Sequence, residues 1–91
     1  MTMIVGRAHA SVGDEKDIQV EWDLPTGYTV TSVEVTATGG TLSTGAHAHT
    51  TVDGVTYAWV TSATAGLCTV TFTALTTFDS PIIRAVTVEF V

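Results

Sequence analysis

Basic residues are scarce in this sequence: Lys and Arg together number 3 among 91 residues, against 9 Asp and Glu, which gives a net charge of −6. Proteins that bind DNA or RNA neutralise phosphates with clustered Lys and Arg side chains. So few cations argue against nucleic acid as a direct partner. Attraction to an anionic membrane surface needs similar basic clusters, so the composition argues against a membrane partner as well.

Cysteine and long apolar runs are also rare. Cys68 is the single cysteine, so the chain forms no internal disulfide and its fold does not depend on an oxidising compartment. No apolar run approaches the roughly 18 residues of a membrane-spanning helix. Arg7 and His9 interrupt the apolar N-terminal stretch, which therefore lacks the continuous apolar region of a secretory signal. We expect a protein that is made in the cytoplasm and is not exported by a signal peptide.

Apolar and β-branched residues dominate instead. Apolar residues make up 45% of the chain and charged residues 13%, about half the usual ~25%. Thr occurs 19 times and Val 13 times. Because β-branched side chains lose rotamer freedom in helices and pack well on pleated sheets, this composition predicts an all-β fold. The length of 91 residues fits one domain, residues 1–91, with a thin core.

Several segments alternate apolar and polar residues with a period of two, which is typical of half-buried strands. The clearest is Ile18–Leu24. Residues 46–52 and 55–61 alternate on either side of Asp53-Gly54, a strong β-hairpin signal. In residues 55–61 the side chains expected to point inward are Val55, Tyr57 and Trp59.

Three other segments have less regular patterns. Within residues 28–38 the apolar side chains change parity, which predicts a β-bulge near Thr31-Ser32. Residues 41–45 are small and polar and fit either a short edge strand or a loop. Phe78–Pro81 is predicted to be a turn.

About seven short strands in a chain of this size predict an immunoglobulin-like β-sandwich. Residues 1–12 form either its first strand or an N-terminal arm that packs onto a neighbouring molecule, and the sequence leaves both interpretations open. The residues expected to be almost fully buried are Trp22, Val35, Trp59, Val70, Phe72 and Val88.

His47 and His49 form the one pattern with the spacing of metal ligands. On a strand over residues 46–52, both imidazoles would point to the same side and could bind one ion. A complete site needs a third and a fourth ligand, which the sequence offers only weakly, in His9 or Asp53. The simpler interpretation is a solvent-facing edge strand with small alanines facing inward. We therefore predict no metal site, with His47 and His49 as weak candidates only.

Other candidates for chemistry are weaker. Cys68 shares parity with Phe72, which predicts a buried thiol in the core rather than a nucleophile. Glu21 and Asp23 lie on an outer strand face, where carboxylates keep a surface solvated. The acidic loop at residues 14–17 contains a lysine and lacks the alternating oxygen ligands of a calcium site. We predict no catalytic residues, no cofactor and no enzymatic activity.

The outer strand positions favour assembly with other chains. They are rich in threonine and poor in lysine, and edge strands without charged side chains are poorly protected against pairing with another strand. The threonines concerned are Thr29, Thr36, Thr38, Thr69, Thr71 and Thr73.

Residues 16–91 contain a series of short motifs. The first half reads Ile18-x-Val20-x-Trp22-x-Leu24-Pro25-x-Gly27, then Val30-x-Ser32-x-x-Val35-Thr36-Ala37 and Gly39-Gly40-Thr41. The second half reads Val52-x-Gly54, Trp59-Val60-Thr61, Ala63-Thr64-Ala65-Gly66, Val70-Thr71, Thr76-Thr77 and a closing Val86-Thr87-Val88. In these motifs the chain resembles the small immunoglobulin-like structural proteins of tailed phages, of the phage fiber-tail adaptor type.

The resemblance implies a non-enzymatic virion protein, made in the host cytoplasm, that bridges other virion proteins of the fiber, tail or connector. It also implies several symmetric copies in each particle, or a homo-oligomer. A capsid decoration or cement protein is an alternative role within the virion. A small module that binds carbohydrate or a host surface is a further alternative from a different class, and a metal-dependent enzyme is the least favoured.

Overall fold

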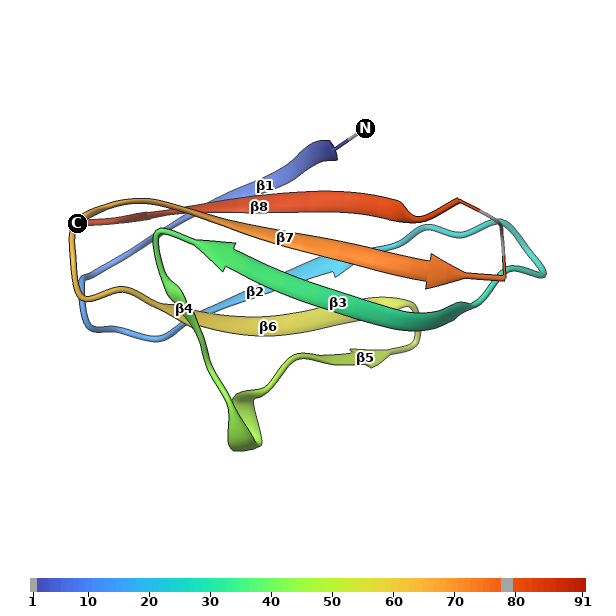
Figure 1. Cartoon of the computed structure of the whole chain (residues 1–91), viewed down its shortest axis with the longest axis horizontal. Helices are drawn as coiled ribbons and strands as arrows, with labels where there is room; N and C mark the ends of the chain where they lie inside the picture. The colour runs from blue at the N-terminus through green and yellow to red at the C-terminus, as the bar shows by residue number, and fades with distance from the viewer. Residues whose placement is uncertain (1, 78–79) are drawn as a thin grey trace.

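The computed structural model describes residues 2–77 and 80–91, which form two β-sheets packed face to face (Figure 1). The first sheet has the order β1 (Thr2–Ala10), β8 (Ile82–Phe90), β7 (Gly66–Thr76), β3 (Val30–Thr38). The second has the order β2 (Lys16–Glu21), β6 (Val55–Thr61), β4 (Thr41–Leu42), and β5 (Thr50–Val52) also pairs with β6. A 3₁₀ turn, η1 (Gly45–His47), lies between β4 and β5. The predicted all-β sandwich is therefore confirmed. In the described residues, no helix is long and apolar enough to cross a membrane.

The core lies between the two sheets and comes from alternate residues of the long strands. On the first sheet, β7 and β8 supply Cys68, Val70, Phe72, Ala74, Val86, Val88 and Phe90. On the second sheet, Ile18, Val20, Trp22, Ala58 and Val60 face them. The predicted burial of Trp22, Val70, Phe72 and Val88 is confirmed. Val35 is only partly buried, although it packs against this core.

Strand β6 presents the opposite face to the one predicted. Thr56, Ala58 and Val60 are at most 1% exposed and point into the core. Consequently the prediction for Val55, Tyr57 and Trp59 is wrong: they are only half-buried and lie on the outer face of the second sheet. One physical reason is a buried hydrogen bond, in which Trp22 Nε1 donates to Thr56 Oγ1 at 2.8 Å. A threonine hydroxyl with a buried donor beside it can face the interior at little cost.

The turn signals identified two local features correctly. The register of β3 against β7 shifts between Val30 and Ser32, which confirms the predicted bulge. Asp53 and Gly54 both have positive φ (52° and 78°) and join β5 to β6, which confirms the hairpin. Residues 41–45 contain the two-residue strand β4. In the predicted turn Phe78–Pro81, residues 78 and 79 lie outside the described part of the chain.

The N-terminal segment is a strand of the chain's own sheet. Strand β1 pairs in parallel with β8, from Thr2 opposite Ile83 to Ala10 opposite Phe90. Ala8 and Ala10 pack against the core. The first half of the strand is more exposed: Figure 1 shows the N-terminal end projecting beyond the rest of the sheet.

Candidate functional site

The strands β1 and β2 leave one border of the sandwich open. Within residues 2–77 and 80–91, β1 pairs only with β8 and β2 only with β6, so each strand has one edge without a strand partner. A groove of about 410 Å³ lies between them. Strand β1 and Arg84 line it on one side, and residues 19–23 line it on the other.

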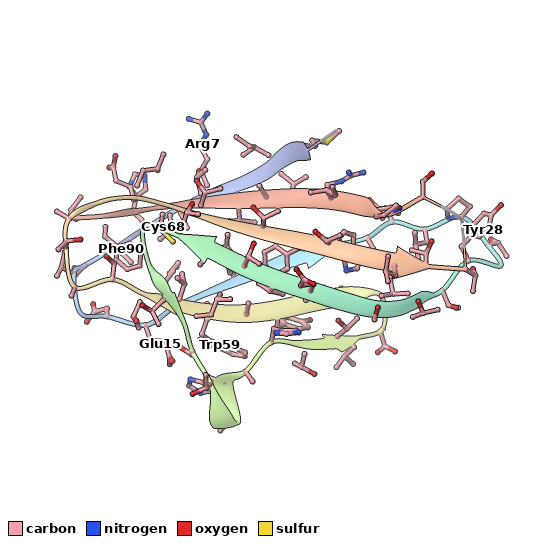
Figure 2. The ribbon with its side chains drawn as sticks, in the orientation of Figure 1. Arg7, Glu15, Tyr28, Trp59, Cys68 and Phe90 are labelled. Carbon is pink, nitrogen blue, oxygen red and sulfur yellow. The ribbon has the colours of Figure 1, made fainter. Side chains whose placement is uncertain are left out.

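This border, which we call the β1/β2 border, has exposed apolar side chains, and its two strands differ in the sign of their net charge. The apolar side chains of β1 are unusually open, with Met3 51%, Ile4 55% and Val5 46% exposed. Strand β1 contains Arg7 and no acidic residue, whereas β2 and the residues on either side of it contain one lysine, Lys16, and five acidic residues, Asp14, Glu15, Asp17, Glu21 and Asp23. Figure 2 shows Arg7 pointing away from the body of the sandwich beside β1. A free edge with exposed apolar groups is a typical binding surface for another strand.

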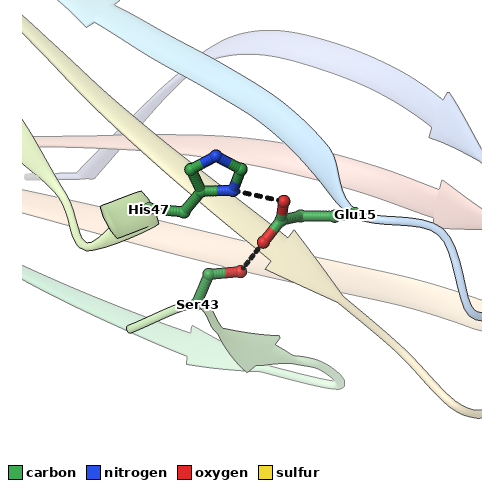
Figure 3. Close-up of polar contacts among 3 residues, drawn as sticks. All are labelled: Glu15, Ser43 and His47. Carbon is green, nitrogen blue, oxygen red and sulfur yellow. Dashed lines mark hydrogen bonds and ion pairs between the residues drawn. The ribbon is translucent and has the colours of Figure 1, made fainter. Parts of the chain in front are cut away.

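A cluster of polar side chains joins three separate segments of the chain beside the second sheet (Figure 3). Glu15, which precedes β2, accepts a hydrogen bond of 2.5 Å from the Ser43 hydroxyl at its Oε2. Its other oxygen, Oε1, forms an ion pair with His47 Nδ1. The imidazole of His47 also stacks on Trp59 of β6, with 4.8 Å between ring centroids and 16° between ring planes. These contacts fasten the η1 segment onto the outer face of the second sheet.

The chemistry of this cluster favours fastening over catalysis. In a nucleophilic triad a histidine accepts the proton of the serine hydroxyl, and an acid orients the histidine. Here the carboxylate of Glu15 lies between Ser43 and His47 and contacts both, so Ser43 donates to the acid instead. The hydrogen bond from Ser43 and the neighbouring His47 lower the pKa of Glu15. No sequence pattern links Ser43 or His47 to Glu15, which stands out in the sequence only as part of the acidic loop at residues 14–17.

This cluster makes stability depend on pH. Because the pKa of Glu15 is lower in the folded chain, the unfolded chain binds more protons near the ordinary glutamate value, and stability falls as pH decreases through the folded value. Glu15→Gln should therefore reduce the acid-induced decrease in unfolding free energy, and Ser43→Ala should reduce it partly. Urea denaturation of the three proteins between about pH 3 and pH 7 measures this. Curves of equal pH slope for wild type and Glu15→Gln would contradict the predicted role of Glu15.

The structure does not bring the weak metal candidates together. The predicted strand over residues 46–52 is wrong, because His47 ends η1 and β5 begins only at Thr50. Strand alternation therefore does not direct the two imidazoles to one side. His47 contacts Glu15, whereas His49 lines a separate shallow pocket together with Glu34 and Val35 of β3. Among the described residues, no group of three or more His, Cys, Asp and Glu side chains has the geometry of a metal site.

The predicted positions of Cys68 and Glu21 are confirmed, whereas Asp23 lies just beyond the end of β2 rather than on a strand. Cys68 has no exposed surface, and burial raises the pKa of its thiol. Glu21 and Asp23 are exposed. His9, on the outer face of β1, forms an ion pair of 3.4 Å with Glu89.

Comparisons with known proteins add evidence on the fold alone. The sequence matches no protein-family model and no curated protein. Its structure is similar to part of a 2,6-sialyltransferase from Photobacterium sp. JT-ISH-224, with a TM-score of 0.55 and 11% identity. That match covers 100% of this chain but only 18% of the sialyltransferase chain. The cysteine protease inhibitor EhICP2 from Entamoeba histolytica has a TM-score of 0.50 and 14% identity, over 97% of this chain and 95% of the inhibitor. These similarities support a two-sheet sandwich.

Proposed function

We propose that this chain is a non-enzymatic structural protein of a tailed-phage particle, an adaptor of the neck or tail that bridges fiber and tail or connector proteins. The sequence motifs of residues 16–91 suggest this role. The structural observation that supports it is the open β1/β2 border, where a free edge carries the exposed side chains of Met3, Ile4 and Val5. Backbone groups of a free edge bind an added strand from a partner, and the apolar side chains supply buried area.

A bridging protein also needs a second surface, and the fold offers one on the opposite side. Strand β3 is the other edge of the first sheet. Its exposed side chains are mainly Thr and Ser, with Glu34 as its one charged residue. The chain can therefore contact one partner at the β1/β2 border and another along β3, since the two borders lie at opposite ends of the strand order.

Disruption of the gene in a phage that carries it tests the proposal. A nonsense codon should leave DNA packaging intact and yield particles that lack fibers, or heads and tails that fail to join, when viewed by electron microscopy. Supplying the wild-type chain from a plasmid should restore infectious particles. Normal, infectious particles without the chain would contradict an adaptor role.

A carbohydrate-binding module is the second candidate, and one observation favours it. Tyr57 and Trp59 lie two residues apart on the outer face of β6, opposite Gln19 and Asp17 of β2. Aromatic rings beside polar side chains on a sheet face can stack on sugars, although His47 covers part of Trp59. Titration with host cell-wall and capsule oligosaccharides tests this candidate by tryptophan fluorescence. Quenching that Trp59→Ala abolishes would support it, and unchanged fluorescence would remove it.

A further inference from the structure

The two free edges of the β1/β2 border have comparable lengths and lie on the same side of the sandwich. Strand β1 has 9 residues and β2 has 6. On the opposite side, β3 has 9 residues whereas β4 has 2. A symmetric contact that uses both sheets at once needs two usable edges on one side, and within residues 2–77 and 80–91 only the β1/β2 border provides them.

A two-fold axis parallel to the strands matches these edges. A half-turn about this axis places the first sheet of one copy beside the second sheet of the other. Consequently β1 of each copy lies next to β2 of the other copy. Figure 1 shows that β1 and β2 run in opposite directions. Each new pair is therefore antiparallel, which allows the well-aligned hydrogen bonds of an antiparallel ladder. The contact is isologous and closes on itself, as most homodimer interfaces do.

The charges on the two edges are complementary only in this mixed arrangement. Arg7 and His9 pair with Thr87 and Glu89 of β8 and lie on the outer face of the first sheet. Asp17 and Glu21 are exposed on the outer face of the second sheet. The two-fold rotation makes these outer faces continuous, so Arg7 of one copy lies beside the carboxylates of the other. Pairing β1 with β1, or β2 with β2, would instead place like charges on neighbouring strands, which is destabilising.

The apolar surface of the border favours the same arrangement. Met3 and Val5 line the groove whose other side includes Val20 and Trp22. A second copy seated along both edges would cover the exposed side chains of Met3 and Val5, at about 25 cal/mol for each Å² of apolar surface removed from water.

We infer that two copies of this chain form a two-fold dimer through the β1/β2 border, with β1 of each copy paired to β2 of the other. The inference rests on the proposed adaptor role and specifies it: the partner at the β1/β2 border is a second copy, and the β3 edge of each copy remains available to other virion proteins. Its test uses the isolated chain in solution, so its result does not depend on whether the chain is found in a phage particle.

Charge exchange with the full-length chain tests the inference. Sedimentation velocity over a wide concentration range should show a reversible dimer for the wild type. Arg7→Glu alone, and Asp17→Lys combined with Glu21→Lys, should each weaken dimerisation by about tenfold or more, since like charges then face each other in both halves of the interface. Mixing the two variants should restore a dimer, because both halves of the mixed dimer regain opposite charges. Glu34→Lys is the control, a charge reversal on β3 at the opposite edge of the first sheet, and it should still dimerise.

Each alternative outcome contradicts the inference in a distinct way. A wild-type chain that stays monomeric at all concentrations rules out the dimer. A dimer that neither variant weakens uses another surface. A dimer that both variants weaken but their mixture does not restore lacks the β1-to-β2 pairing. Circular dichroism of each variant confirms that the comparison is between folded proteins.

Discussion

Trp22→Ala is expected to destabilise the domain by about 3–5 kcal/mol, the range found for large aromatic-to-alanine changes in a core. Trp22 is 5% exposed and packs between the sheets, and its indole N–H donates to the buried Thr56 hydroxyl. A domain of this size has a total stability of about 5–15 kcal/mol, so the variant should be largely unfolded or melt far below the wild type. Urea denaturation followed by circular dichroism measures the difference.

Trp59→Ala is the matched control, because it removes the same side chain from the outer face of the same sheet. It loses the stacked contact with His47 and should cost about 0.5–1.5 kcal/mol. Trp22→Phe should also stay folded, at a cost of about 1 kcal/mol, since Thr56 keeps its contact of 2.7 Å with the Thr51 hydroxyl. Equal destabilisation by Trp22→Ala and Trp59→Ala would show that the assignment of faces to β2 and β6 is wrong.

Gly39→Ala is expected to cost about 2–4 kcal/mol, from left-handed backbone strain together with a steric clash. Gly39 has a φ of +79°, and a Cβ there would lie 2.5 Å from the carbonyl oxygen of Leu67. The clash is with the backbone of β7, which is held between β3 and β8 and cannot move aside.

Gly27→Ala separates the two causes. Gly27 has a similar φ of +94° but no atom within 4 Å of its Cβ position, so it should show the strain alone, about 1–2 kcal/mol. Thermal unfolding of both variants gives the comparison. If Gly39→Ala is no more destabilising than Gly27→Ala, the close approach of the turn after β3 to β7 is incorrect.

The strands were predictable where local signals decide the structure. The alternation of Ile18–Leu24, the positive-φ turn at Asp53-Gly54 and the parity change at Thr31-Ser32 each depend on a few neighbouring residues. Such signals need no knowledge of the rest of the fold, so the all-β sandwich could be inferred from them.

The face of β6 could not be predicted in this way, because both of its faces carry residues suited to a core. Val55, Tyr57 and Trp59 are larger and more apolar than Thr56 and Ala58, so a period of two favoured the wrong side. The choice depends on tertiary contacts: Trp22 bonds to Thr56 inside, and His47 covers Trp59 outside.

The candidate sites depend on distant contacts in the same way. Glu15 lies 28 residues from Ser43 and 32 from His47, and no local pattern links them. Likewise, the sequence shows that residues 1–12 are apolar but does not show that β1 pairs with β8 and leaves a free edge beside β2. The open border can therefore be recognised only from the order of strands in the two sheets.

Cryo-electron microscopy of purified phage particles that carry this gene is the most direct measurement of the proposed adaptor role. The expected result is density for the sandwich at the neck or tail, in several symmetric copies that together contact two different virion proteins. Particles that lack the chain would contradict the proposal, and so would density confined to the outer surface of the capsid, which would assign the chain to capsid decoration instead.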